Sequence, residues 1–121
     1  MSKKILVVED TEDNRQILRD LLSTAGYDMV EAHDGAEGVA KASEHKPDLI
    51  LMDIQMPVMD GYEATRQIKA NPELKGIPIV AVTSYALSGD EEKARAAGCD
   101  GYIAKPYSPR QMLAKVREVI G

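Results

Sequence analysis

The sequence predicts a single α/β domain with a doubly wound (βα)5 fold, in which helices cover both faces of a five-stranded parallel sheet. Short apolar runs alternate along the chain with longer segments of helical periodicity, and this alternation is typical of parallel βα units with right-handed crossovers. The runs are nearly continuous rather than strictly alternating, as strands buried on both faces require. We therefore expect strands at residues 4–8, 28–32, 48–52, 77–83 and 101–104, with the more polar 28–32 at an edge.

The first helix is expected between residues 13 and 25. Asp13 and Gln16 have the spacing of a capping pattern at its start. An apolar stripe follows on one face, and Gly26 is the kind of residue that ends a helix in the left-handed conformation. The stripe consists of Ile17, Leu18, Leu21, Leu22 and Ala25.

Four further helices are expected, at residues 35–44, 61–70, 88–97 and 108–120. Ser88 and Glu91 form a capping-box pattern for the fourth helix, and Ser108 with Gln111 forms another for the last, where Pro109 suits the first helical position. The fourth helix has only small residues and Leu87 to bury, which is typical of an element of low stability. The buried face of the last helix is expected to consist of Met112, Leu113, Val116 and Ile120.

The size and composition of the chain fit one globular domain, with 121 residues of which 44% are hydrophobic and 29% charged. We expect residues 1–121 to form this domain alone, with no output domain. The net charge of −5, without a run of Lys and Arg, argues against nucleic-acid binding. One cysteine, Cys99, excludes an internal disulfide, and the N-terminal apolar stretch is too short for a signal sequence or membrane span. We expect a cytoplasmic protein without membrane attachment.

Acidic residues stand at the carboxyl ends of the first and third predicted strands. Glu9 and Asp10 follow the first strand, and Asp53 follows the third. In a doubly wound sheet the site lies beyond those ends, where the strand order reverses. If the two strands are neighbours, three carboxylates converge, which is unfavourable without a cation. Oxygen ligands and high negative charge suit Mg²⁺ (or Mn²⁺), although any one acid after a strand can instead cap the next helix.

A hydroxyl and an ammonium group follow the other strands, because Thr83 ends the fourth and Lys105 follows the fifth. A carboxylate can act as a nucleophile and form an acyl phosphate. Phosphoryl transfer is catalysed mainly by positioning and charge neutralisation, which a cation and the Lys105 ammonium would provide. Asp53 is the better nucleophile because it lies at the centre of the sheet, whereas the adjacent Glu9 and Asp10 can share one ion.

Four motifs occur in order along the whole chain, namely VVED at 7–10, LMDIQMPVMDG at 51–61, AVTS at 81–84 and YIAKP at 102–106. Together they resemble the receiver domain of two-component response regulators, in the CheY-like superfamily. Among receivers, the chain is most similar to the stand-alone, single-domain type that resembles DivK.

The resemblance implies a flavodoxin-like sheet of strand order 2-1-3-4-5 and a phosphoryl group accepted by Asp53 from a phosphohistidine. It also implies metal ligands, groups that contact the phosphoryl oxygens, a switch pair and a cis-proline. These are Glu9, Asp10, Asp53 and the backbone carbonyl of Gln55 for Mg²⁺, Thr83 and Lys105 for the phosphoryl group, Thr83 and Tyr102 for the switch, and Pro106 after a cis bond.

The resemblance implies a phosphorylation-switched signalling module, not an enzyme beyond its own phosphorylation and autodephosphorylation. The expected phosphodonor is a sensor histidine kinase or a histidine phosphotransfer protein. A downstream protein partner would bind the face formed by the fourth helix, the fifth strand and the fifth helix. We expect a monomer that either switches partner binding or relays phosphate. If the Thr83 hydroxyl moves toward the added phosphoryl group, the ring of Tyr102 can move into the vacated space.

Other functions remain open at this point. A Mg²⁺-dependent phosphohydrolase with an aspartate nucleophile would carry a second acid two residues later, where this chain has Gln55. A flavin-binding electron carrier would need a phosphate-binding loop after the first strand, where this chain has the acidic segment 9–15. The chain could also be a receiver from a larger hybrid kinase. His33 and His45 lie away from the acids, so we expect neither to carry phosphate.

Overall fold

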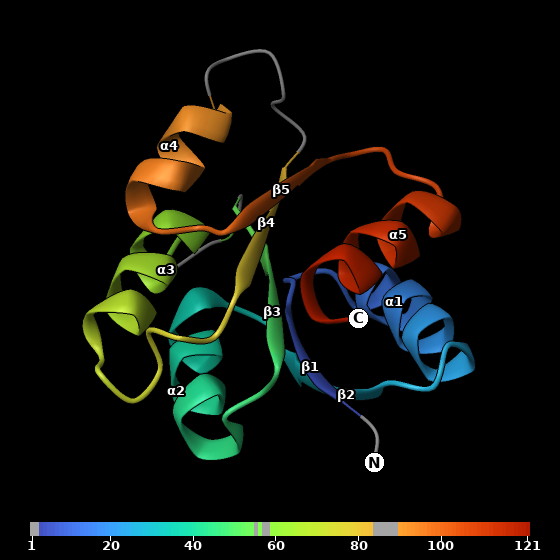
Figure 1. Cartoon of the computed structure of the whole chain (residues 1–121), viewed down its shortest axis with the longest axis horizontal. Helices are drawn as coiled ribbons and strands as arrows, with labels where there is room; N and C mark the ends of the chain where they lie inside the picture. The colour runs from blue at the N-terminus through green and yellow to red at the C-terminus, as the bar shows by residue number, and fades with distance from the viewer. Residues whose placement is uncertain (1–2, 55, 57–58, 84–89) are drawn as a thin grey trace.

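The computed structural model describes residues 3–54, 56, 59–83 and 90–121, in which five strands alternate with five helices (Figure 1). The strands are β1 (Lys4–Val8), β2 (Asp28–Ala32), β3 (Leu49–Asp53), β4 (Ile79–Thr83) and β5 (Gly101–Ala104). The helices are α1 (Glu12–Thr24), α2 (Gly35–His45), α3 (Gly61–Ala70), α4 (Asp90–Ala97) and α5 (Pro109–Ile120). All pairs are parallel, in the order β2-β1-β3-β4-β5, which confirms the predicted fold.

Helices cover both faces of the sheet (Figure 1). The helices α1 and α5 lie on one face, and α2, α3 and α4 lie on the other. Alternate residues of β1 and β3 enter two separate cores, because successive side chains of a strand point to opposite faces. Every residue of β3 is buried, which explains why this strand is apolar up to its last residue.

The predicted starts of α3 and α5 are confirmed. In α5, the Gln111 amide donates to Ser108 Oγ at 3.1 Å, and the Ser108 amide donates to Gln111 Oε1 at 2.7 Å. Pro109 is the first helical residue, and in α3 the Glu63 amide donates to Asp60 Oδ1 at 2.9 Å. These bonds satisfy amides that the helices leave unpaired, and they define where the chain enters each helix.

The predicted cap of α1 at Asp13 is wrong. The helix begins at Glu12, and Thr11 is its N-cap, with an extended backbone (φ −94°, ψ 123°) and no side-chain cap bond. Asp13 therefore lies in the first turn, where negative charge interacts favourably with the helix dipole. Gly26 follows the helix with φ 92°, as predicted.

The prediction that Ile17 belongs to the buried face of α1 is also wrong, because this residue is 58% exposed. The helix α1 packs on the sheet through the buried Leu18 and Leu22. Ile17 is rotated about 100° from Leu18 around the helix axis, which turns it away from the sheet. In α5, Leu113 and Ile120 are only partly buried beside the core.

Two strand boundaries differ by one or two residues from the prediction. The strand β4 begins at Ile79 because the Ile77 amide donates to the Leu74 carbonyl in a turn, and Pro78 has no amide hydrogen for the ladder. The strand β3 extends to Asp53, which pairs with Val82 of β4. The sheet itself therefore holds the backbone of Asp53.

Some predictions fall on Gln55, Leu87 and Ser88, which lie outside the described residues. Of the described side chains of α4, Ala94 and Ala97 are buried, in agreement with the narrow apolar face expected for this helix. Within the described residues, no helix has the length and apolar character needed to cross a membrane.

Candidate functional site

The strands β1 and β3 lie side by side at the centre of the sheet, with Val8 opposite Met52. Because the pairing is parallel, the residues that follow these two positions emerge at the same edge of the sheet. Glu9 directly follows β1, and Asp53 is the last residue of β3. The strands β1 and β3 are therefore neighbours, which is the condition for Glu9, Asp10 and Asp53 to converge.

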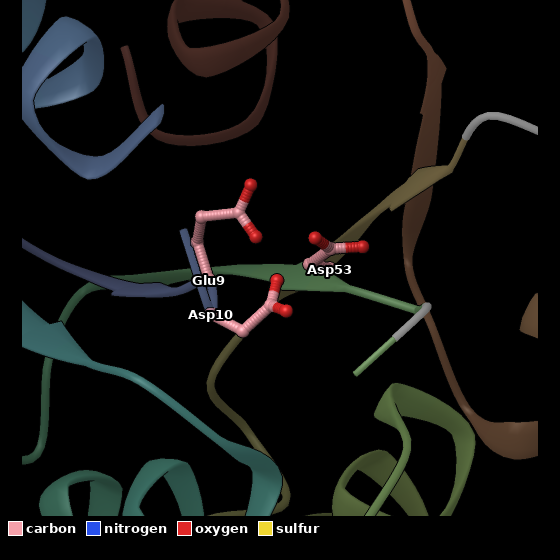
Figure 2. Close-up of side chains that lie close together, drawn as sticks. All are labelled: Glu9, Asp10 and Asp53. Atoms are coloured by element: carbon pink, nitrogen blue, oxygen red, sulfur yellow. The ribbon is translucent and has the colours of Figure 1, made fainter. Parts of the chain in front are cut away.

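The carboxylates of Glu9, Asp10 and Asp53 converge at this edge and face a common space (Figure 2). One carboxylate oxygen of each residue lies within 4.8 Å of the others. Glu9 and Asp53 are each only 4% exposed, whereas Asp10 is exposed. The cluster is thus a buried pair of acids with a third acid on its solvent side.

The charges of this cluster oppose one another. Burial raises the pKa of Glu9, and the neighbouring Asp53 raises it further. Desolvation also raises the pKa of Asp10, with Glu9 as the next cause. Both directions mean that the ionised cluster is unfavourable by itself, so a bound cation would stabilise it.

Lys105 follows β5 and supplies one positive charge. Its Nζ lies 3.2 Å from Asp53 Oδ2 and 3.5 Å from Glu9 Oε1. Burial alone would lower the pKa of Lys105, but the charges of Asp53 and Glu9 outweigh burial and raise it, so the ammonium stays charged. Its peptide bond to Pro106 is cis, as the resemblance implies. Three carboxylates and one ammonium still leave two negative charges in excess.

The donor set fits a hard divalent cation. Oε2 of Glu9 is buried and has no hydrogen-bond partner among the described residues, which is costly unless an ion binds it. The described ligand candidates are all carboxylate oxygens, which suit Mg²⁺ or Mn²⁺ rather than zinc. The structure therefore brings together Glu9, Asp10, Asp53 and Lys105, as the sequence analysis predicts, while the Gln55 carbonyl lies outside the described residues.

Thr83 and Tyr102 lie on the next two strands. Thr83 is fully buried at the end of β4, and its carbonyl accepts a hydrogen bond of 2.7 Å from the Lys105 amide. Tyr102 of β5 pairs with Ala81 of β4 and packs, partly buried, against the core on the side of α2, α3 and α4. A hydrogen bond between main-chain atoms thus joins Thr83 to Lys105.

Two residues of α1 that the sequence analysis did not select contact the acids. Asn14 Nδ2 donates to Glu9 Oε1 at 2.6 Å, and Arg15 Nη1 donates to the Glu9 carbonyl at 2.6 Å. The only sequence signal is their position in the first turn of a helix that starts directly after the acids. Gly61 also matters for the site. A Cβ at this position would come 2.4 Å from the Asp53 carbonyl oxygen, so only glycine fits beside the end of β3.

A hollow of about 620 Å³ opens beside the acids. Its lining consists of Asn14, Ile17, Lys105, Pro106 and Tyr107. The exposed Ile17 therefore borders an accessible surface close to Asp53 rather than the core.

Other candidate groups lie outside the cluster. His33 is on the surface, where its Nδ1 lies 2.6 Å from Glu37 Oε1. Cys99 is buried against Thr65, and burial raises the pKa of its thiol. Neither residue belongs to the acidic cluster.

The chain matches the family described as the response regulator receiver domain over residues 5–117. The polar-differentiation response regulator DivK of Brucella anthropi is 43% identical over 121 residues, a match that covers 100% of this chain and 98% of that protein.

Two solved structures show the same likeness in three dimensions. The chemotaxis protein CheY4 of Vibrio cholerae superposes with a TM-score of 0.93 at 32% identity, covering 98% of this chain and 99% of that one. The receiver domain of a Pseudomonas aeruginosa sensor histidine kinase, solved with a magnesium ion coordinated in its active site cleft, gives 0.93 at 37% identity and covers 100% and 99%. This chain therefore belongs to the response regulator receiver domain family of two-component signalling proteins.

Proposed function

We propose that Asp53 accepts a phosphoryl group from a phosphohistidine of a sensor histidine kinase or a histidine phosphotransfer protein. The observation that carries this proposal is the cluster at the end of β3, where Asp53 is buried, fixed by the strand ladder and 3.2 Å from the Lys105 ammonium. A receiver domain implies a histidine kinase as partner. The proposal takes the chain to act as a monomer in the cytoplasm, where its single thiol stays reduced.

In the proposed transfer, a carboxylate oxygen of Asp53 forms a bond to phosphorus as the bond from phosphorus to the imidazole nitrogen breaks. The electron pair of that bond stays on the imidazole. Lys105 neutralises charge on the phosphoryl oxygens, and the buried position of Asp53 limits competition from water. Glu9, Asp10 and Asp53, with the Gln55 carbonyl, would hold Mg²⁺, which supplies further charge neutralisation when bound.

The proposed readout of phosphorylation uses Thr83 and Tyr102. A phosphoryl group on Asp53 offers acceptor oxygens to a hydroxyl on the neighbouring strand, and β4 pairs with β3 at this point. Movement of Thr83 would change the space beside Tyr102 on β5. The helix α4 is the adjacent element best suited to shift, because only Ala94 and Ala97 of its described side chains are buried. A downstream partner would bind the face formed by α4, β5 and α5.

A phosphodonor protein must cover the entrance to Asp53. The surface beside that entrance contains Ile17, the only large hydrophobic residue of the described chain that is strongly exposed. An exposed apolar side chain at the border of a hollow is suited to a protein contact. We therefore place the docking surface of the phosphodonor at Ile17 and the neighbouring Pro106 and Tyr107.

A receiver that passes phosphate onward within a relay is the second candidate. Its support is the 37% identity to the receiver domain of a sensor histidine kinase. The chemistry at Asp53 would be the same. The two functions differ in whether phosphorylation changes the affinity of a partner or whether the phosphoryl group moves to a second histidine.

The first prediction concerns the cation. Mg²⁺ at a hundred times its Kd should stabilise the wild type by about 2.7 kcal/mol. Asp10→Asn should remove most of this effect while raising the melting temperature of the metal-free protein at pH 7.5. In the wild type, the pKa of the Asp10 carboxyl is raised in the folded state, so the ionised carboxylate lowers stability above that pKa. The gain should shrink as the pH falls from neutral into the acidic range, because the Asp10 carboxyl of the wild type, whose pKa is raised in the folded state, then takes up a proton. Thermal melts with and without Mg²⁺ measure this, and an Asp10→Asn protein stabilised as strongly as wild type would contradict it.

The second prediction concerns the phosphoacceptor. Acetyl phosphate with Mg²⁺ should label the wild type once per chain, and Asp53→Asn should abolish labelling because the amide is not a nucleophile. Asp20→Asn, an exposed acid on α1, is the matched control and should be labelled normally. Intact-protein mass spectrometry gives the result. Full labelling of Asp53→Asn would refute the assignment, and steady turnover of many phosphomonoesters would favour a hydrolase.

The third prediction concerns the switch. Thr83→Ala should be phosphorylated to a similar extent as wild type but should lose most of the change in partner affinity on phosphorylation. The reason is that the hydroxyl acts after the transfer, not during it. Partner binding by calorimetry, with and without phosphodonor, measures the change. The switch proposal is wrong if the wild type binds its partner equally well in both states.

The fourth prediction concerns docking. Ile17→Asp should slow transfer from a phosphohistidine protein about tenfold, which corresponds to about 1.4 kcal/mol of lost contact energy. Labelling by acetyl phosphate should be unchanged, since a small donor needs no protein surface. Ala40→Asp, at an exposed site on the opposite face, is the control. Equal rates for Ile17→Asp and wild type with the protein donor would exclude this surface.

A further inference from the structure

The two carboxylate oxygens of Glu9 have different surroundings. Oε1 accepts a hydrogen bond of 2.6 Å from Asn14 Nδ2 and lies 3.5 Å from Lys105 Nζ. Oε2 is buried without a hydrogen-bond partner among the described residues. Since Glu9 is 4% exposed, water does not readily replace the missing partner. One oxygen of Glu9 is thus held in place while the other is left for an ion.

The first turn of α1 holds Glu9 at two points. Asn14 binds the side chain, and the next residue, Arg15, donates from Nη1 to the Glu9 carbonyl at 2.6 Å. Arg15 is itself fixed by Glu12 Oε2 at 2.7 Å and by Glu31 Oε1 at 3.4 Å. Both contacts of Glu9 therefore come from the first turn of α1, which the ion pair between Arg15 and Glu31 joins to β2.

We propose that Asn14 is a positioning residue of the cation site, which holds Glu9 Oε1 so that Oε2 faces the space shared with Asp10 and Asp53. This inference rests on the proposed function, because it requires that a divalent cation binds at this cluster. Asn14 does not contact the cation in the inference. It acts through the orientation of Glu9.

An amide is well suited to this task. A neutral N–H donor fixes the carboxylate without cancelling its negative charge, whereas a lysine or arginine at the same place would compete with the metal. Lys105, the other group near Oε1, is farther away and also contacts Asp53 Oδ2. When Lys105 turns to a phosphoryl oxygen, Asn14 continues to hold Glu9. The orientation of Glu9 is then independent of the phosphorylation step.

The experiment measures binding of the metal alone. Mn²⁺ binding is followed by electron paramagnetic resonance, and Mg²⁺ binding is followed by competition, in wild type and Asn14→Leu. Loss of a group that orients a metal ligand typically weakens metal binding by 10–100-fold, so we expect Asn14→Leu to raise the Kd by at least about tenfold. Gln16→Leu, an exposed amide two residues later, is the matched control and should bind as wild type does. Asn14→Ala provides a second variant if the leucine side chain disturbs the fold.

A double-mutant cycle distinguishes positioning from a general structural effect. In a Glu9→Ala background, the same change at Asn14 should leave the Kd for Mn²⁺ unchanged within about twofold, because the side chain that Asn14 orients is gone. An equal loss of affinity in both backgrounds would overturn the inference, as would wild-type affinity in Asn14→Leu and Asn14→Ala. If the wild type itself binds no Mn²⁺ or Mg²⁺ at the cluster, the proposed function fails, and the inference fails with it.

Discussion

Parallel pairing of β1 with β3 determines where the chemistry of this chain can take place. The register that sets Val8 opposite Met52 also sets Glu9 beside Asp53, and a shift of one residue would move one acid to the opposite face of the sheet. The apolar residues of β1 and β3 enter both cores, so their burial fixes that register. Hydrophobic packing on the two faces of the sheet thus imposes a close approach of charges at its edge.

This close approach of like charges lowers the stability of the metal-free fold. Two buried acids and a third beside them are compensated within the cluster by a single ammonium, that of Lys105. The raised pKa values of Glu9 and Asp10 express the same imbalance. A cation would relieve it, and a phosphoryl group would add negative charge again. If a cation and a phosphoryl group bind here as proposed, the stability of the fold depends on the occupancy of the site, and binding would change the balance between conformations of an element such as α4, of whose described side chains only Ala94 and Ala97 are buried.

The sequence predicts the strand order, most helix boundaries and the main residues of the site, because strand ends in a parallel sheet share one edge. It does not predict features that depend on helix rotation. Ile17 fits an apolar stripe in the sequence, yet its exposure depends on how α1 sits on the sheet. Asp13 fits a cap pattern, but the chain leaves β1 so that the helix begins one residue before Asp13, at Glu12. Asn14 shows no pattern at all, because its role depends on the reach of one amide to one oxygen.

The length of the Glu9 side chain explains why a contact with Asn14 is useful. A glutamate has one more rotatable bond than an aspartate, so holding its carboxylate in a single orientation costs more conformational entropy. The shorter side chain of Asp10 has fewer orientations to restrict, whereas the longer side chain of Glu9 gains more from a hydrogen-bond partner. Asn14 is that partner at one oxygen, and the buried surroundings leave the other oxygen few alternatives to an ion. The longer acid that follows β1 and the amide in the first turn of α1 thus form one unit, in which Asn14 offsets the flexibility of Glu9.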